Sequence, residues 1–372
     1  MTVCQITSCA SRNNLRIFYK QCLTLKERGI DAVLLCNDEK ADALVCGIKI
    51  FSIHKKYKNR ITRFIMSGFH FYRKLKLIRA DFYQIHEPEL LLMGYVLSLR
   101  GEKVVWDCHE DYLYLFRHER KYIPKRFQTI LGKIYELIER IIVKKFFAII
   151  TVDPAITNRY KKINANSYTV TNFPLLREDH DMVIEIKREK IISFAGMVPS
   201  GYCFDMLCQA LKMINDYKLV LASTYMYKSE YERFKKEIQK YGIEEKIEFM
   251  ENLTYKEVIE LYKRSSLGFA VHRPINISKS KQVGSWGLLK IFEMMAAGLP
   301  MLIDKNDISR VLVEKEKCGF FVENANSIVD VVKSIELKPE ILKEKSDNCR
   351  RAYEEKYNWT SQEKTYYSIF SS

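Results

Sequence analysis

Several features that would assign a chain to a special class are missing from this 372-residue sequence. None of its ten cysteines forms a C-x-x-C pair or a cluster with zinc-site spacing, so we expect buried thiols in a reducing compartment. The first residues lack the charged and long apolar parts of a signal peptide, and no run approaches the ~18 apolar residues of a membrane span. There is no internal repeat or low-complexity tract. We therefore expect a cytoplasmic globular protein.

The order of apolar runs indicates an α/β protein of two domains. Short β-type runs alternate with longer helical patterns, such as 16–29, which predicts parallel sheets covered by helices. The predicted strands are 3–7, 32–36, 82–86, 103–108, 148–152, 191–196, 218–223, 246–250, 267–271 and 299–304.

A polar stretch near 176–190 separates the two series of strands. We assign 1–175 and 185–350 to two Rossmann-like, doubly wound domains, and 351–372 to a C-terminal helix that packs back towards the first. The whole of 339–370 has a helical pattern. Two such domains in series predict a ligand cleft between them, at the carboxyl ends of the strands.

Positive charge is concentrated in the first half of the chain. The formal net charge is +15; residues 1–175 hold 30 basic and 16 acidic side chains, a net charge of +14, and the remainder holds 31 and 30. The stretches 55–79 and 117–145 mix Lys and Arg with aromatic and aliphatic residues, as interfacial segments do. We expect these stretches to dock on an anionic membrane surface. The alternative is two solvated helix faces whose apolar sides pack on their own sheet.

The segment 284–304, G-S-W-G-L-L-K-I-F-E-M-M-A-A-G-L-P-M-L-I-D, carries the clearest chemical signal. Its first two glycines would form a loop where backbone N–H groups can approach a ligand, and Gly298 would end the helix that follows. Lys290 and Glu293 share one face of that helix. A helix N-terminus with a lysine favours a diphosphate, and the carboxylate can accept two ribose hydroxyls. The alternative is an ordinary exposed ion pair.

This segment resembles the nucleotide-binding signature of the GT4 family of retaining glycosyltransferases, which have the GT-B fold and include bacterial capsule, lipopolysaccharide and exopolysaccharide enzymes. The resemblance implies that Glu293 binds the donor ribose and that Lys290 lies near the phosphates. Ser285 stands where many members carry a second Glu. The implied donor-binding residues are Gly196, Arg273, Ser285, Gly287, Leu288, Leu289, Lys290 and Glu293.

The resemblance extends to the first half of the chain. The stretches 13–35, 81–91 and 103–112 are similar to the family's R-I-F-x-K-E opening, its H-D-P strand end and its K-V-V-Y-D-x-H-E-D segment. The resemblance implies that His109 contacts the transferred sugar and acts in catalysis with Lys290 and Glu293. Candidate acceptor-side or cleft residues are Arg16, His86, Glu87, Glu110 and Asp111.

One loop departs from the family pattern. The stretch 194–202 takes the place of the family's G-R-L-x-x-x-K-G, and Gly196 is retained. Met197 and Tyr202 replace the phosphate-binding Arg and Lys. We therefore expect Lys290, with Arg273, Lys279 or Lys281, to neutralise the diphosphate.

Taken together, these patterns predict a glycosyltransferase that moves a sugar from a nucleotide diphosphate to a lipid-linked saccharide, peripheral on the inner face of the cytoplasmic membrane. Because the family that the chain resembles does not require a divalent ion, we expect no metal site and no cofactor. The resemblance implies retention of anomeric configuration. The alternatives are a nucleotide-sugar 2-epimerase of the same fold, a catalytically inactive GT-B scaffold, and a nucleic-acid binder suggested by the pI of 9.2. The last leaves 284–304 unexplained, so we expect no nucleic-acid partner.

Overall fold

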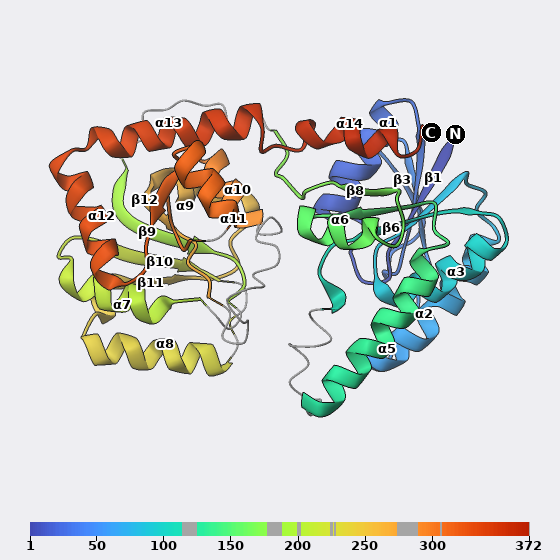
Figure 1. The fold of residues 1–372 in the computed structure, drawn as a ribbon, viewed down its shortest axis with the longest axis horizontal. Coiled ribbons are helices and arrows are strands. Elements are labelled where there is room, and N and C mark those ends of the chain that lie inside the picture. Colours follow the sequence, from blue (N-terminus) through green and yellow to red (C-terminus); the bar gives the residue numbers. More distant parts are fainter. Residues whose placement is uncertain are drawn as a thin grey trace. The chain divides into compact units, whose positions relative to one another are not determined.

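The computed structural model describes residues 1–113, 125–176, 188–198, 202–223, 226, 228–273, 289–305 and 307–371. The chain divides into two compact units (Figure 1). Unit 1 comprises Met1–Asn172 with Gln362–Ser372, and unit 2 comprises Phe173–Ser361. Each unit is an α/β sheet with helices on both faces, as the alternating pattern predicts.

Unit 1 contains an eight-stranded sheet in the order β3-β4-β2-β1-β5-β6-β7-β8. All neighbours are parallel except the edge pair β3 and β4. Crossovers therefore run in both directions from β1, the doubly wound arrangement in which ligands bind beyond the carboxyl ends of the central strands. The strands are β1 (Thr2–Ile6), β2 (Asp31–Cys36), β3 (Ala43–Val45), β4 (Ile48–Ser52), β5 (Phe82–Ile85), β6 (Lys103–Cys108), β7 (Ala148–Thr151) and β8 (Ser167–Thr169).

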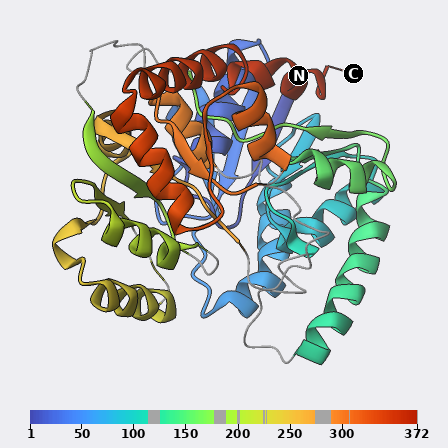
Figure 2. The same cartoon turned by 60° about the vertical axis from the view of Figure 1, so that its left-hand side comes forward.

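The helices of unit 1 cover both faces of this sheet. Buried residues of α2, α3, α5 and α6 share one apolar core with the strands, and α3 contacts both α2 and α5 (Figures 1 and 2). The π-helix η1 begins at its cap Asn14, whose side chain accepts two backbone N–H groups, and α1 continues it until Gly29, which has a φ of +76°. The helices are η1 (Leu15–Cys22), α1 (Leu23–Glu27), α2 (Arg60–Leu75), η2 (Pro88–Leu90), α3 (Leu91–Leu99), α5 (Lys125–Val143) and α6 (Pro154–Lys161).

The C-terminal segment forms two helices, α13 (Glu340–Glu355) and α14 (Thr360–Ser368), where the sequence pattern suggested one. The side chain of Asn358 accepts the Ser361 backbone N–H between them, and its amide donates to the last carbonyls of α13. Beyond residue 361 the chain is part of unit 1, where the Phe370 ring packs edge-on against Phe82 of β5.

Unit 2 contains a parallel six-stranded sheet in the order β11-β10-β9-β12-β13-β14. Two apolar cores lie on its two faces, one lined by α7, α8 and α12 and the other by α9, α10 and α13 (Figure 2). The strands are β9 (Glu189–Ala195), β10 (Lys218–Ala222), β11 (Ile247–Met250), β12 (Ser265–Phe269), β13 (Met301–Ile303) and β14 (Gly319–Phe321). The remaining helices are α7 (Phe204–Met213), α8 (Lys228–Tyr241), η4 (Glu244–Lys246), α9 (Tyr255–Arg264), α10 (Leu289–Ala296), α11 (Asp307–Arg310), η5 (Val311–Lys315) and α12 (Ala325–Leu337).

All ten predicted strands are present, whereas β3, β4, β8 and β14 were not predicted. These four lie at or next to the edges of the two sheets, and three of them have only three residues. Such short segments give too little apolar pattern to be recognised. Among the described residues no helix is both long and apolar enough to cross a bilayer.

Candidate functional site

Helix α10 carries two of the predicted site residues, Lys290 and Glu293. Its inner face is buried and packs on β12 at Gly268, where an added Cβ would lie 2.6 Å from the Met294 sulfur. The helix ends as the sequence predicts, because Gly298 has a φ of +63° and its N–H bonds to the Met295 carbonyl. This packing holds the first turn of α10 beside the carboxyl end of β9.

The Lys290 ammonium lies over two aromatic rings. Its Nζ is 3.9 Å from the ring centroid of Phe194, in β9, and 4.6 Å from that of Tyr202. The Nζ also lies next to Gly196, where an added Cβ would approach it to 3.5 Å. Gly196 has a φ of +121°, which favours glycine. The structure therefore brings the glycine of the 194–202 loop together with the lysine of α10.

Burial dominates the electrostatics of Lys290. Burial lowers its pKa to about 7, although the Glu293 carboxylate, one turn along α10, acts in the opposite direction. Among the described residues the ammonium makes no hydrogen bond and no ion pair. In the described part of the chain, no carboxylate therefore lies at contact distance to neutralise the charge that Lys290 carries when it is protonated.

The other predicted donor residues divide into two groups. Leu289 begins α10 and is half-buried, whereas Arg273 follows β12 and donates to the Val322 carbonyl at 3.2 Å. Ser285, Gly287 and Leu288 lie outside the described residues, as do Lys279 and Lys281.

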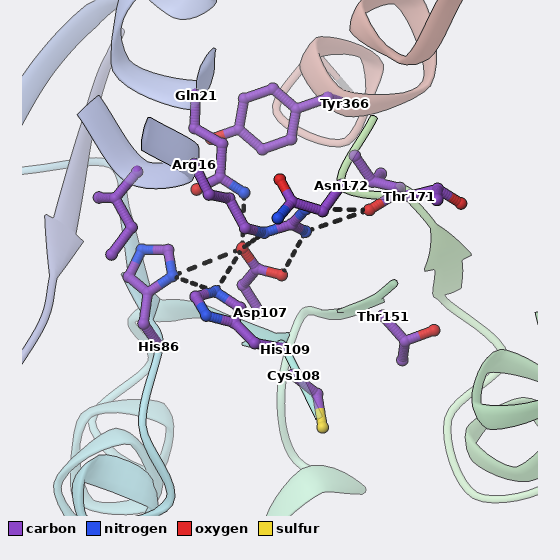
Figure 3. A network of polar contacts seen from close by, with 12 residues as sticks. Arg16, Gln21, His86, Asp107, Cys108, His109, Thr151, Thr171, Asn172 and Tyr366 are labelled. Atoms are coloured by element: carbon purple, nitrogen blue, oxygen red, sulfur yellow. Dashed lines mark hydrogen bonds and ion pairs between the residues drawn. The ribbon is translucent and has the colours of Figure 1, made fainter. Parts of the chain in front are cut away.

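In unit 1, a buried carboxylate organises the end of β6. Asp107 is fully buried and pairs with the Arg16 guanidinium through both oxygens, at 2.7 and 3.0 Å (Figure 3). Gln21 of η1 donates to the same carboxylate at 2.5 Å. Burial alone would raise the pKa of Asp107, but the charge of Arg16 and the hydrogen bonds that Asp107 accepts outweigh it and hold that pKa well below its usual value. Asp107 is therefore an anion with several donors.

Two histidines complete this network and their partners define their tautomers. The Nε2 of His86 faces the Gln5 Oε1 at 2.7 Å, so it must carry the proton that it donates. Burial lowers the pKa of His86, so its Nδ1 is an acceptor. The His109 Nε2 lies 3.0 Å from this Nδ1 and 3.1 Å from Asp107, and it therefore donates to both (Figure 3). The His109 Nδ1 is left without a partner in the described part of the chain.

A metal ion fits this cluster poorly. His86, Asp107 and His109 present ligand atoms within 4.8 Å of one another, a spacing that a cation could bridge. The Asp107 carboxylate is already bound by the Arg16 guanidinium, whose positive charge would oppose a second cation. Hydrogen bonds among the described side chains account for all three residues.

Solved structures share this architecture over the whole chain. Sucrose-phosphate synthase from Thermosynechococcus elongatus matches with a TM-score of 0.72 at 13% identity, covering 100% of this chain and 98% of that one. Anabaena Alr3699/HepE, solved in complex with UDP-glucose, matches with a TM-score of 0.68 at 10% identity, covering 100% and 99%. WaaG, a glycosyltransferase involved in lipopolysaccharide biosynthesis, matches with 0.66 at 14%, covering 100% of both chains.

The chain has the GT-B fold. Residues 177–356, nearly all of the second GT-B unit, also match the family model described as glycosyl transferases group 1. Among curated proteins, no sequence matches this chain significantly. The predicted GT-B fold is thus confirmed, and the unit that carries Lys290 and Glu293 is similar to group 1 glycosyl transferases.

The predicted acceptor-side residues occupy different places in the first GT-B unit. Arg16 and His86 are buried in the Asp107 network, so they can influence a ligand only through their neighbours. Glu87 accepts hydrogen bonds from Thr7 and Ser8, and burial raises its pKa. Glu110 is exposed.

Asp111 forms an ion pair with Arg159 of α6, at 2.8 Å. This pair ties the chain just after His109 to a neighbouring helix.

Sequence reasoning missed Asp107 and the polar chain behind it. Tyr366 of α14 donates to the Gln84 Oε1 at 3.0 Å and accepts from Gln5 at 2.8 Å. Gln84 in turn donates to Asp107 at 3.4 Å. The available signal was a polar residue in each of three otherwise apolar strands, at positions that register brings side by side, as with Gln5 and Gln84.

An open pocket of about 760 Å³ lies in the same unit, beyond the ends of β1, β2 and β4. Most of its lining residues are polar, and the charged ones include Asp38, Glu39, Lys55 and Lys56. The pocket adjoins the start of α2 through Arg63, which pairs with Glu89.

Proposed function

We propose that this protein is a glycosyltransferase that moves a sugar from a nucleotide diphosphate to a saccharide acceptor, with retention of anomeric configuration. The observation that carries the proposal is the un-neutralised Lys290 ammonium beside Gly196, at the start of α10. This arrangement lies in the unit that matches group 1 glycosyl transferases. A nucleotide sugar supplies the diphosphate that such a cation would bind.

The donor site combines two sources of positive charge. The first turn of α10 presents backbone N–H groups to an anion, and Lys290 adds a full charge. Their charge would stabilise the diphosphate as it leaves, without a divalent ion. Glu293, one turn further along, binds the ribose hydroxyls. The relative Alr3699/HepE was solved with UDP-glucose, which supports this class of donor.

His109 is the proposed contact to the transferred sugar. Its Nε2 is committed to His86 and Asp107, so only Nδ1 can meet a hydroxyl group. An Nδ1 without a proton would accept a hydrogen bond from that hydroxyl. In this proposal the leaving phosphate takes the acceptor's proton, which requires no carboxylate nucleophile.

A nucleotide-binding panel and a product assay test the proposal. Glu293→Ala should weaken binding of UDP or GDP by about 1.5–3 kcal/mol, typical of a charged hydrogen bond, and abolish transfer. The control Glu260→Ala removes an exposed carboxylate from α9 and should change neither. Unchanged nucleotide affinity in Glu293→Ala would refute the ribose contact. Turnover of a nucleotide sugar without acceptor would indicate the epimerase instead, and nucleotide binding without any turnover the inactive scaffold.

The proposed acceptor is a lipid-linked saccharide on the cytoplasmic face of the membrane, used in cell-surface polysaccharide synthesis. One structural relative, WaaG, is involved in lipopolysaccharide biosynthesis, which supports an acceptor of this kind. A second support is an exposed apolar surface on three adjacent helices of unit 1. This α2–α3–α5 surface comprises Ile61, Phe64, Ile65, Met66, Phe69, Leu92, Val96, Leu99, Phe127, Ile130, Leu131, Ile134, Leu137, Ile138 and Ile141.

Basic side chains accompany this surface, and an anionic bilayer would satisfy both features. Arg73, Lys76, Lys133 and Arg140 are exposed on or next to the same helices. Each basic residue close to an anionic leaflet contributes roughly 1 kcal/mol. The apolar side chains would enter the headgroup region. The expected location is therefore peripheral, on the inner leaflet.

Vesicle sedimentation tests the membrane proposal. The protein should sediment with anionic vesicles at low salt, and Ile65→Glu with Leu137→Glu should reduce this binding. Replacing Lys55, Lys56, Lys58 and Arg60 by Glu should reduce it too, without altering nucleotide affinity. The matched control replaces Lys228, Lys235, Lys236 and Lys256 of unit 2 by Glu and should bind as the unmodified protein does. Protein that stays in the supernatant at low salt would favour a soluble acceptor.

A further inference from the structure

The loop that departs from the family pattern supplies an aromatic ring to the lysine on α10. Tyr202 stands where the resembled signature has a lysine, and Met197 where it has an arginine. The Tyr202 ring instead lies under the Lys290 ammonium, beside the closer ring of Phe194. The face of an aromatic ring attracts a cation. Where the resembled family has a second cation, this chain thus has an aromatic ring that contacts the Lys290 ammonium.

Other aromatic contacts hold the two rings in place. Phe194 and Tyr202 pack edge-on with centroids 4.8 Å apart, and Phe204 packs against both. The Tyr202 ring also contacts the His272 ring, and the two residues form a β-bridge. Neither ring can turn away without disturbing this cluster, so the ammonium has a defined position.

The charged and titratable groups around this position come from four places. Glu293 lies on α10 itself, and Tyr262 of α9 has a pKa that burial and Glu293 raise. The Tyr202 ring contacts the His272 ring, and burial and Asp304 raise the pKa of Tyr202. Only Glu293 among these changes the pKa of Lys290. The ammonium is therefore partly deprotonated near neutral pH, because burial lowers its pKa to about 7.

We propose that Phe194 and Tyr202 form an aromatic clamp that positions the Lys290 ammonium for the donor diphosphate, and that Lys290 takes up a proton as the diphosphate binds. The proposal rests on the donor site of the proposed function. An arriving anion adds the opposite charge that the free site lacks, so it favours the protonated lysine. Donor binding then depends on pH through Lys290.

Calorimetric titration with UDP-glucose and with GDP-mannose tests the proton uptake. Their diphosphate diesters do not titrate between pH 6 and 8, so protons exchanged there come from the protein. Measurements in Tris and HEPES, which differ in ionisation enthalpy, should give an uptake of about 0.9 proton at pH 8 and about 0.1 at pH 6, as expected for a pKa near 7. Lys290→Arg should still bind but take up none, because a guanidinium stays charged.

These outcomes separate the two proposals. Binding with little uptake at pH 8, or uptake that persists in Lys290→Arg, would overturn the role of Lys290 while leaving the donor site intact. If neither nucleotide sugar binds, the proposed function fails, and this inference fails with it.

Three substitutions test the clamp. Tyr202→Leu removes the ring and should weaken donor binding about 5- to 30-fold, the range of a partly desolvated cation–π contact. Tyr202→Phe keeps the ring and should stay within about 3-fold of the unmodified affinity, by the same reasoning. Phe204→Leu removes a neighbouring ring that supports both clamp rings but does not contact Lys290, so it should lower the melting temperature and weaken donor binding less than Tyr202→Leu does.

A double-mutant cycle distinguishes positioning from a general structural effect. If Tyr202 acts through Lys290, Tyr202→Leu should have almost no effect on donor affinity in the Lys290→Ala background. If Tyr202→Leu weakens donor binding as much in the Lys290→Ala background as it does alone, the clamp is overturned. An equal loss in Phe204→Leu would overturn it as well, because any damage to the aromatic cluster would then suffice.

Discussion

Removing the Arg16 charge should destabilise unit 1 severely. In Arg16→Met the Asp107 carboxylate stays fully buried but loses its bidentate partner, since both guanidinium bonds to it are absent. Breaking a buried ion pair in this way costs about 3–5 kcal/mol. For a unit of this size each kcal/mol lowers the melting temperature by about 2–4 °C, which gives a decrease of roughly 6–20 °C.

The dependence on pH gives this prediction a specific signature. In the unmodified protein the folded pKa of Asp107 is lowered, so its contribution to stability is present above about pH 4 and lost as the pH falls through that lower pKa. In Arg16→Met burial should raise the pKa instead, so folding would favour the protonated acid. The difference in melting temperature between the two proteins should therefore be larger at pH 8 than at pH 5.

Thermal unfolding of the full chain, followed by circular dichroism, measures both effects. Arg28→Met is the control, because Arg28 pairs with Glu363 at 3.1 Å while half exposed and its loss should cost less than about 1 kcal/mol. A double variant with Arg16→Met and Asp107→Asn should recover part of the stability. If Arg16→Met melts no lower than the control, Asp107 is not a buried anion that depends on Arg16.

Three further substitutions test the Asp107 network of unit 1 and the Lys290 site of unit 2. Asp107→Asn removes the anion that accepts from His109 and should lower kcat at least about tenfold, with nucleotide affinity unchanged in titrations; equal kcat would remove Asp107 from the reaction. Tyr366→Phe deprives two buried glutamine amides of a partner and should cost about 1–3 kcal/mol in thermal unfolding, so an unchanged melting temperature would contradict the network. Met197→Arg adds a second cation beside Gly196; donor affinity should rise, and Lys290→Ala should then cost less affinity than it does alone.

The residue pattern within each segment was sufficient to predict the architecture. Nine of the ten predicted strands lie inside their sheets as buried apolar runs, and the sequence predicts them because a strand buried on both faces needs no partner to be recognised; the tenth, β11, is an edge strand. The end of α10 is also local, since a helix followed by Gly298 in the left-handed region has few alternatives. The placement of Lys290 and Glu293 on one helix face could also be predicted from the sequence, because the two residues share one turn of one helix.

The polar network of unit 1 could not be predicted from the residues of any one segment. Gln5, Gln84, Asp107 and Tyr366 come from three strands and the last helix, which are far apart in the sequence. The sequence indicated His109 but assigned Arg16 and His86 to the acceptor side, whereas both are buried supports of Asp107. Only the strand order and register bring these side chains within hydrogen-bond distance.

The sequence by itself determined the fold class, the order of the two units and the presence of Lys290 in the first turn of α10, because these depend on interactions between residues near in the chain. The tertiary structure decided what surrounds that lysine. In the sequence, Tyr202 is notable only because it stands where the resembled family has a cation. Its ring contacts Lys290 because α10 packs on the sheet that contains β9. Burial and aromatic contacts are properties of neighbours in space, so the pKa of Lys290 could not be inferred from the residues that flank it.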